Sequence, residues 1–308
     1  MALPGVYSMT IDVVVYLSSL QKIAGRKKDV LEAFGEGCRR SGARVMFQTK
    51  TELIPAKLAV ILGWPSPLQH TPNIRLRSAV VKDQKRHNRH VMAIDGSTFK
   101  FHDAEGKYLR YSLNGVFYDT SQYANKNSDG GRWQMIQQDL HMNMMPWQQN
   151  NGHILFLMQR DGGWSMKGLN PIEWVFSTYT EVRKHSDLPI LIRPHPGKHI
   201  DLAPLNSLAG ATLIDSKNTS LQDNLTNAKA ACVFNSSSGV AAILQGIPLI
   251  VNDSSSVCWD VSDHDYSAVN APSFKDRTQW INDLAAAHWS DEEARQGLVF
   301  NKFLPYLT

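Results

Sequence analysis

Several short polar segments follow apolar runs in this chain and contain residue types that could carry chemistry. The first is Arg193-Pro194-His195-Pro196, which follows the apolar run Leu188–Ile192. An arginine there can bind a phosphate through a bidentate contact, and a histidine can donate a hydrogen bond or proton to a leaving oxygen. The two prolines stiffen the backbone around them. The alternative is a rigid turn that carries surface charge.

A second polar segment, Asn235-Ser236-Ser237-Ser238-Gly239, lies between an expected strand and an expected helix. Small polar residues at a helix start leave backbone N–H groups free to face an anion, and the helix dipole favours negative charge there. A diphosphate is the natural ligand for such a loop. An ordinary serine N-cap with a tight turn is the alternative.

Two further segments also follow apolar runs. In the segment 159–165, glycines allow a ligand to approach the backbone, and Trp164 could stack on a flat base. A plain glycine turn fits this segment equally well. In Ile94-Asp95-Gly96-Ser97 a carboxylate follows a strand-like run, where it can act as a base. Asp-Gly is also a common turn, so this signal alone is weak.

A run of basic side chains precedes Asp95, and the chain carries a formal net charge of +4. The run predicts either a solvated helix face or contacts with the phosphates of a nucleic-acid acceptor. Its members are Arg75, Arg77, Lys82, Lys85, Arg86, His87, Arg89 and His90.

Other classes of site have little support. The three cysteines, Cys38, Cys232 and Cys258, are too few and too scattered for a disulfide framework or a zinc site. Asp263-His264-Asp265 could suggest a metal–diphosphate site, but it follows no evident strand, and we expect a polar surface loop. We therefore expect no metal site. The sequence has no Gly-x-Gly-x-x-Gly fingerprint or P-loop, which disfavours a dehydrogenase or a P-loop kinase.

The 308 residues allow one large domain or two ordinary ones. No apolar run approaches the ~18 residues of a membrane-spanning helix, and the first residues lack a secretory pattern. We therefore expect a soluble, cytoplasmic protein that does not associate with membranes. The oligomeric state cannot be inferred from the sequence.

The elements that must position these segments alternate between strands and helices. Expected strands are Ile11–Leu17, Ala43–Phe47, Leu58–Leu62, His90–Ile94, His153–Met158, Leu188–Ile192, Ala230–Phe234 and Ile247–Val251. Expected helices are Lys27–Ser41, Leu76–His87, Pro171–His185, Ser220–Ala228 and Val240–Gln245. The polar stretch Thr120–Gly152 predicts a loop-rich linker. This alternation is typical of an α/β fold with parallel sheets, whose ligands lie beyond the carboxyl ends of the strands.

These residues also resemble a known family. RPHP after a strand, together with NSSSGVAAILQGIPLIV, resembles the two-domain GT-B glycosyltransferases. The nearest likeness is to capsule-polysaccharide sugar transferases and to their phage relatives, which include candidates for decorating modified DNA bases. HVMAIDGSTF and LRYSLNGV resemble the acceptor side of that group. WDVS, and RTQWINDLAAAHW with Glu292 and Glu293, resemble the C-terminal tail of the phage members.

The resemblance runs from about Leu58 to the C-terminus. It implies two Rossmann-like domains that face a cleft. We expect an acceptor-binding domain over 1–150 and a nucleotide-sugar-binding domain over 151–308. The last helix could pack back on the first domain. One departure is that many relatives have a glutamate after Ser-x-Gly that binds the donor, where this chain has Ala241 or Ala242.

The resemblance also implies an activity, which is metal-independent transfer of a sugar from a nucleotide-sugar, with UDP as the expected nucleotide and no further cofactor. Asp95 would take the acceptor proton, His195 would assist the leaving diphosphate, and the anomeric carbon would be inverted. Donor contacts are expected from Gln159, Arg160, Trp164, Ser165, Arg193, Lys198, Asn235, Ser236, Ser237, Ser238 and Gly239. Acceptor contacts are expected from Ser97, Lys82, Arg86 and Arg110.

The resemblance of the tail to the phage members, together with the basic run, the positive net charge and the compact length, implies a 5-hydroxymethylpyrimidine in phage DNA as the acceptor. Such a base would have to be flipped out of a duplex or presented in a single strand. A polysaccharide (capsule-type) glycosyltransferase is the first alternative. A non-catalytic nucleotide-sugar-binding protein on the same scaffold is the second, and the missing glutamate favours it. A sugar-phosphate epimerase of this fold is a weaker option.

Overall fold

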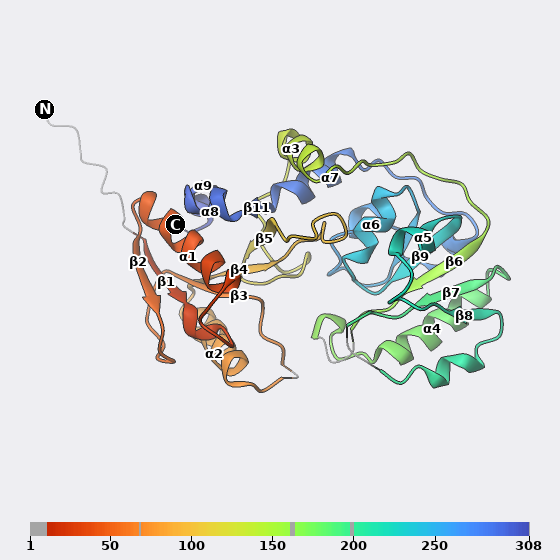
Figure 1. Cartoon of the computed structure of the whole chain (residues 1–308), viewed down its shortest axis with the longest axis horizontal. Coiled ribbons are helices and arrows are strands. Elements are labelled where there is room, and N and C mark those ends of the chain that lie inside the picture. Colours follow the sequence, from red (N-terminus) through yellow and green to blue (C-terminus); the bar gives the residue numbers. More distant parts are fainter. Residues whose placement is uncertain (1–10, 68, 161–163, 198–199, 308) are drawn as a thin grey trace, which may run out of the picture.

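A computed structural model describes residues 11–67, 69–160, 164–197 and 200–307 of the chain. It contains two α/β units, each built around its own sheet (Figure 1). The first unit holds the red and orange elements, and the second holds the green and cyan elements. Of the helices in the described ranges, none has the length and apolar character that crossing a bilayer requires.

The first sheet has six strands in the order β11-β5-β4-β3-β1-β2. Its strands are β1 (Asp12–Tyr16), β2 (Arg44–Gln48), β3 (Leu58–Leu62), β4 (His90–Gly96), β5 (Tyr108–Leu113) and β11 (His288–Ser290). The strands β1 to β4 pair in parallel, whereas β5 runs antiparallel to both β4 and β11.

Alternation along β1 explains why this sheet is covered on both faces. Val13 and Val15 pack into a core with α1 (Arg26–Arg40), and Val14 and Tyr16 pack into a second core with α2 (Pro72–Arg86). Side chains on a strand point alternately to the two faces, so a run of apolar residues demands a helix on each side.

The second sheet has five parallel strands in the order β10-β9-β6-β7-β8. They are β6 (His153–Leu157), β7 (Ile190–Arg193), β8 (Ala211–Leu213), β9 (Ala228–Val233) and β10 (Leu249–Val251). Its helices are α4 (Pro171–Arg183), α5 (Leu221–Leu225) and α6 (Ser238–Leu244). Parallel strands joined through helices present all their carboxyl ends at one edge.

The chain after the second sheet returns to the first unit. It forms α7 (Thr278–Ala286), then β11, α8 (Asp291–Arg295) and α9 (Leu298–Phe303). Strand β11 pairs with β5, and both α8 and α9 pack on α1. The chain therefore crosses between the units twice, and the last helices lie beside α1 in Figure 1. The proposed boundary at residue 150 stays a prediction.

The stretch Thr120–Gly152, expected to be a loop-rich linker, is mostly irregular, as expected, but it also contains one helix, α3 (Gly131–Asp139). Trp133 and Ile136 of α3 are buried, and the helix packs on α7. Only these two residues of the helix are buried, so the sequence shows no repeating apolar stripe that would predict the helix. Contacts with α7, much later in the sequence, stabilise α3 in place of a strong local signal.

Candidate active-site cleft

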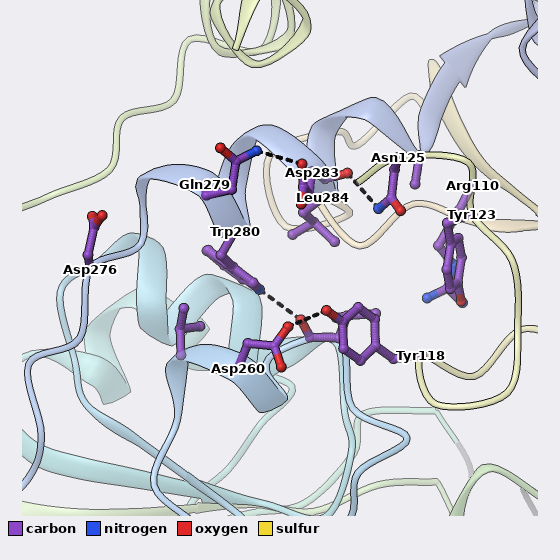
Figure 2. Close-up of a pocket in the computed structure, with 13 residues that line it drawn as sticks. Arg110, Tyr118, Tyr123, Asn125, Asp260, Asp276, Gln279, Trp280, Asp283 and Leu284 are labelled. Carbon is purple, nitrogen blue, oxygen red and sulfur yellow. Dashed lines mark hydrogen bonds between the residues drawn. The ribbon is translucent and has the colours of Figure 1, made fainter. Parts of the chain in front are cut away.

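A cleft of about 400 Å³ lies between the two units, at the carboxyl ends of β4 and β6. This volume is within the range of small-molecule sites. Its lining includes Trp64, Asp95, Ser97, Lys100 and Arg110 from the first unit and Gln159, Arg160, Ser165, His195, Asn235, Ser236 and Ser237 from the second. A smaller cavity adjoins the cleft and shares Arg110 and Val257 with it (Figure 2).

Asp95 lies near the end of β4 and is held in place by its neighbour strand. It pairs in register with Arg110 of β5, whose Nη2 donates to Asp95 Oδ2 at 2.8 Å. The Arg110 side chain is 12% exposed, and that of Asp95 is 39% exposed. The guanidinium is therefore a fixed part of the wall, while the carboxylate remains accessible from the cleft.

The loop after β4 is held by a buried histidine of the C-terminal segment. His288 Nε2 accepts a hydrogen bond from the Thr98 N–H at 3.0 Å, and Nδ1 donates to the Leu284 carbonyl at 2.8 Å. Complete burial lowers the pKa of His288 to about 3, so the ring stays neutral and keeps this pattern. Ser97 lies in the same loop, and its Oγ accepts from the Phe99 N–H at 3.0 Å.

His195 follows β7 and lines the opposite wall. Its Nδ1 accepts a hydrogen bond from the Gly197 N–H at 2.9 Å. Burial, and then the neighbouring Lys100 and Arg160 charges, lowers the pKa of His195 below its ordinary value. The ring is thus neutral at pH 7, with the proton on Nε2, and it can donate a hydrogen bond to an anion.

Lys100 and Arg160 make this end of the cleft strongly positive. Desolvation and then the Arg160 charge lower the pKa of Lys100, while Asp95 acts in the opposite direction. The residues come from different units, so the positive charge spans the cleft. Arg160 was expected at the site, but Lys100 was not. The only signal for Lys100 in the sequence is its position shortly after Asp95.

Gln159 and Asn235, both expected to contact the nucleotide-sugar, form hydrogen bonds with each other. Asn235 N donates to Gln159 Oε1 at 3.0 Å, and Gln159 Nε2 donates to Asn235 Oδ1 at 2.8 Å. The Asn235 amide also donates to the Ser165 carbonyl at 2.6 Å and to Ser255 Oγ at 2.7 Å. These amides therefore shape the cleft floor.

The serine loop provides free donors beside that floor. The N–H groups of Ser236 and Ser237 find no acceptor within the part of the chain that the structure describes. Ser238 donates to Ser236 Oγ at 2.8 Å and lines an adjoining cavity. Gly239 is buried, and a Cβ there would come within 2.7 Å of the Leu249 side chain. Its role is close helix–strand packing.

Arg193 has a different setting from the one expected. Its guanidinium donates to Thr219 Oγ1 at 3.1 Å, to the Asn224 side chain, and to the carbonyls of Ser216 and Thr219 at 3.2 and 3.0 Å. These bonds hold the segment between β8 and α5 and compete with phosphate binding. A phosphate role for Arg193 stays a prediction. Lys198 and the stretch 161–163 lie outside the described residues, as does the Trp164 side chain.

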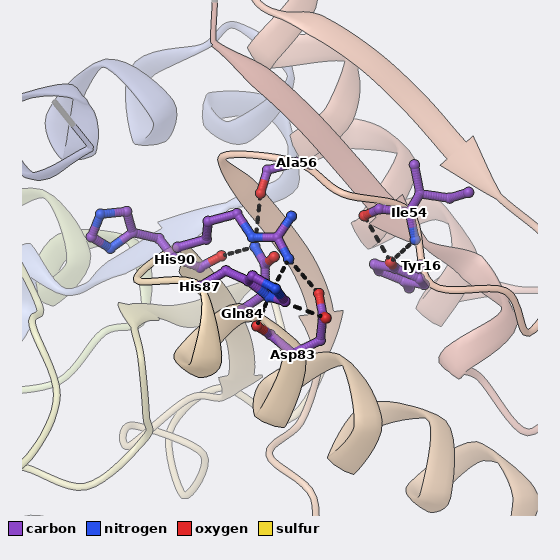
Figure 3. A network of polar contacts seen from close by, with 8 residues as sticks. Tyr16, Ile54, Ala56, Asp83, Gln84, His87 and His90 are labelled. Atoms are coloured by element: carbon purple, nitrogen blue, oxygen red, sulfur yellow. Dashed lines mark hydrogen bonds and ion pairs between the residues drawn. The ribbon is translucent and has the colours of Figure 1, made fainter.

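The basic run does not converge on the cleft. Lys82 and Arg86 are exposed on α2 and do not line the cleft. Arg89 pairs with Asp83, which also contacts His87, and Gln84 Nε2 donates to the Ala56 and His90 carbonyls at 3.1 and 2.7 Å (Figure 3). His87 and Arg89 of the run therefore contact the end of α2, and it is Gln84, outside the run, that joins α2 to the sheet.

The aspartates around His264 have structural partners. Asp263 Oδ2 accepts from the Ser273 N–H at 2.8 Å, and Asp265 Oδ1 accepts from the Ser267 N–H at 2.7 Å. The His264 ring stacks on Trp259 at 3.5 Å. Over the described ranges, His, Cys, Asp and Glu side chains form no group of three or more that could hold a metal ion.

Comparisons with known proteins define the fold. A scan against protein-family models and a search of curated proteins find no match. Among solved structures, the chain is similar to the β-Kdo 2,4 transferase of KpsC from Thermosulfurimonas dismutans, with 14% identity, a TM-score of 0.54 and 90% of each chain covered. It is also similar to the β-Kdo 2,7 transferase of the same KpsC, with 15% identity, a TM-score of 0.54, and 94% and 99% of the two chains covered. The predicted GT-B arrangement of two α/β units is confirmed.

Proposed function

We propose that this protein is a glycosyltransferase that moves a sugar from a nucleotide-sugar to a hydroxyl of an acceptor. One observation carries the proposal. A carboxylate, Asp95, and a group of positive or hydrogen-bond-donating side chains, Lys100, Arg160 and His195, line a single cleft between two GT-B units. A transferase of this kind needs a base for the acceptor and positive charge for the leaving diphosphate.

The donor diphosphate is proposed to lie at the positive end of the cleft. Lys100 and Arg160 offset its charge, and the His195 Nε2–H donates to the leaving oxygen. The N–H groups of Ser236 and Ser237, which have no acceptor among the described residues, add backbone donors. The group is arranged before the donor arrives, because the Gly197 bond sets the His195 tautomer and the Gln159–Asn235 pair sets the floor. Such fixed dipoles stabilise developing charge without rearrangement.

The acceptor hydroxyl is proposed to lie at Asp95. Its oxygen attacks the anomeric carbon and forms the new glycosidic bond, while the bond from that carbon to the diphosphate oxygen breaks. The proton of the hydroxyl passes to Asp95, and the electron pair of the broken bond leaves with the diphosphate. A single displacement of this kind inverts the anomeric carbon. Arg110 is a positioning residue, because its bond fixes the Asp95 carboxylate.

The structure gives no support to the DNA acceptor expected from the basic run. Lys82 and Arg86 lie away from the cleft lining, and other members of the run pair within the first unit. A saccharide acceptor is the better match, because three carboxylates, which would repel the phosphates of DNA, line the cavity that adjoins the cleft. A 5-hydroxymethylpyrimidine in DNA remains an outcome of the assay.

The test is a transfer assay with UDP-, GDP-, dTDP- and CMP-sugars against two acceptor pools. One pool holds mono- and disaccharides, and the other holds DNA with 5-hydroxymethyluracil or 5-hydroxymethylcytosine. We expect a mass gain in the saccharide pool with one donor. Loss of a general base costs about 10²–10⁴-fold in kcat, so Asp95→Asn should show that loss.

The matched control is Asp187→Asn, because Asp187 is exposed and lies outside the cleft lining. It makes the same chemical change and should leave transfer at the wild-type rate. If the wild type binds a nucleotide-sugar but turns over no donor in the panel, the non-catalytic binding protein replaces this proposal.

A further inference from the structure

The smaller cavity beside Asp95 has no role in the chemistry above. It measures about 220 Å³, which is room for one sugar ring, and it shares Arg110 and Val257 with the main cleft. Its walls come from the loop after β5 (Tyr118, Asn125), from the short helix Trp259–Val261, and from α7 (Figure 2). Both units therefore contribute to it, next to the proposed base.

Two carboxylates in this cavity are held in position and still have acceptor capacity. Asp260 Oδ2 accepts from the Tyr118 hydroxyl, and Asp283 Oδ1 accepts from Gln279 Nε2 at 2.8 Å and from the Ser128 N–H at 2.8 Å. Asp260 Oδ1 and Asp283 Oδ2 have no partner in the described part of the chain. Each can accept a hydrogen bond from a ligand hydroxyl.

The other lining groups suit the rest of a sugar. The Trp280 ring is fixed by its Nε1–H, which donates to the Val257 carbonyl at 2.7 Å. Together with Leu284 it offers an apolar surface for the C–H groups of a ring. The buried Nε of Arg110, at the boundary with the main cleft, has no partner among the described residues. The cavity therefore combines polar groups with an apolar surface, and a sugar presents hydroxyls and C–H groups that match both.

Charge separates this cavity from the main cleft. Three carboxylates, Asp260, Asp276 and Asp283, line it, and the one lining cation among the described residues, Arg110, is already paired with Asp95. Asp276 lies apart from the other two in Figure 2. The cavity therefore disfavours a phosphate, whereas the Lys100–Arg160 end of the main cleft favours one. An uncharged group that donates hydrogen bonds fits best.

We propose that this cavity, the acidic subsite, binds an uncharged sugar ring of the acceptor and presents its neighbouring hydroxyl to Asp95. The assignment of the hydroxyl to Asp95 rests on the proposed function. Binding of the ring does not, because it depends on Asp260, Asp283 and Trp280. The subsite excludes the phosphates of DNA through the same carboxylates that bind the sugar.

The test is saturation-transfer NMR with glucose, galactose and N-acetylglucosamine as free sugars, and with a short single-stranded DNA as the rival probe. We expect at least one sugar to bind the wild type weakly, and the DNA not to compete. Asp260→Asn should weaken sugar binding by about tenfold or more, because a hydrogen bond to a charged acceptor is lost. Binding of UDP, measured by calorimetry, should not change.

Two further variants keep the test decisive if Asp260→Asn fails to fold. Gln279→Ala changes an exposed side chain that lines the same cavity, and it should also weaken sugar binding. Asp187→Asn should leave sugar binding at the wild-type level. The proposal is overturned if no sugar binds, if Asp260→Asn binds the sugar as the wild type does, or if the DNA displaces it.

The two proposals fail in different ways. If sugar binding depends on Asp260 but the protein turns over no nucleotide-sugar, the acidic subsite stands and the transferase activity is ruled out. If the protein transfers sugar and Asp260→Asn leaves the KM for the acceptor unchanged, the proposed function stands and the acidic subsite is ruled out.

Discussion

At the scale of single residues, the cleft depends on charges that lie close together. Burial lowers the pKa of Lys100, and the Arg160 charge lowers it further, since like charges repel. For His195, burial acts first, and then Lys100 and Arg160 lower its pKa further. A bound diphosphate would relieve this repulsion. The cluster is therefore poised for an anion, and the neutral His195 remains a hydrogen-bond donor.

The Lys100 contribution can be measured directly. In Lys100→Gln one positive neighbour is lost, so the protonated form of His195 becomes less unfavourable and the pKa of His195 should rise towards its ordinary value. The imidazole carbon signals, followed by NMR from pH 5 to pH 8, report this midpoint. The wild-type midpoint should lie below ~6.5, and the variant midpoint should be higher.

A matched control exists in the first unit. Burial and then Lys57 lower the pKa of His90. Lys57→Gln should therefore raise the midpoint of His90 and leave His195 unmoved. If Lys100→Gln leaves the His195 midpoint where it was, Lys100 does not face that ring, and its place in the proposed donor site is lost.

The same residues show what the sequence could and could not predict about the site. The sequence predicts Arg160 and His195 for the site because each follows an apolar strand, and strand ends meet at one edge of a parallel sheet. Asp95 follows a strand of the other sheet, and its place in the site is implied by the family resemblance. Lys100 was missed because its position depends on the loop after β4. That loop is held by His288, far away in the sequence.

At the scale of elements, the strands that are buried on both faces were the predictable ones. The expected Leu58–Leu62 matches β3 at both ends, because continuous apolar residues are required there. The three-residue strands β8 and β11 were not expected. Ala211–Leu213 and His288–Ser290 have no such run, and they form strands because β7 and β5 pair with them. Long-range pairing of this kind leaves little local trace.

The contact between α1 and α8 offers an element-scale prediction. A Cβ on Gly37 would come within 1.8 Å of the Ala294 carbonyl oxygen, which belongs to the backbone. Gly37→Ala gains about 1 kcal/mol of helix propensity, but forcing backbones apart costs roughly 1–3 kcal/mol or more. We expect a net loss of stability, seen as a lower midpoint in urea unfolding followed by circular dichroism.

Gly96→Ala is the control for this change. A Cβ on Gly96 meets no atom within 4 Å, so its unfolding midpoint should stay at the wild-type value. A Gly37→Ala protein that is as stable as the wild type would show that α8 does not pack so closely on α1.

At the scale of the whole molecule, the two units share a core on one side and a cleft on the other. Phe99 and Tyr108 of the first unit belong to the same apolar cluster as Leu155 of the second, joined through α3 and α7. The two segments that connect the units also contact each other, since the Trp147 Nε1–H donates to the Lys275 carbonyl at 2.9 Å. A shared apolar side restricts motion, so we expect opening to occur about that side.

Polar contacts across the cleft oppose this opening. Asp119, in the loop that follows β5, accepts from Ser254 Oγ at 3.0 Å and lies 3.9 Å from Lys167 Nζ. The bridge between Leu113 and Gln122 anchors the loop to the first sheet. Lys167 is 45% exposed and pairs more closely with Asp253, at 2.9 Å, so its ion pair with Asp119 is weak and sensitive to salt. We therefore expect closure of the cleft to depend on ionic strength.

Asp119→Ala tests that dependence. An exposed ion pair is worth up to ~1 kcal/mol, or about a fivefold change in the open population. In the wild type, raising the salt concentration should increase the separation of spin labels placed on α2 and α4, measured by electron paramagnetic resonance. In Asp119→Ala the labels should already be farther apart at low salt and should respond less. Asp187→Ala should behave as the wild type, because its carboxylate lies outside the contact. An unchanged salt response in Asp119→Ala would mean that the apolar side alone sets the separation of the units.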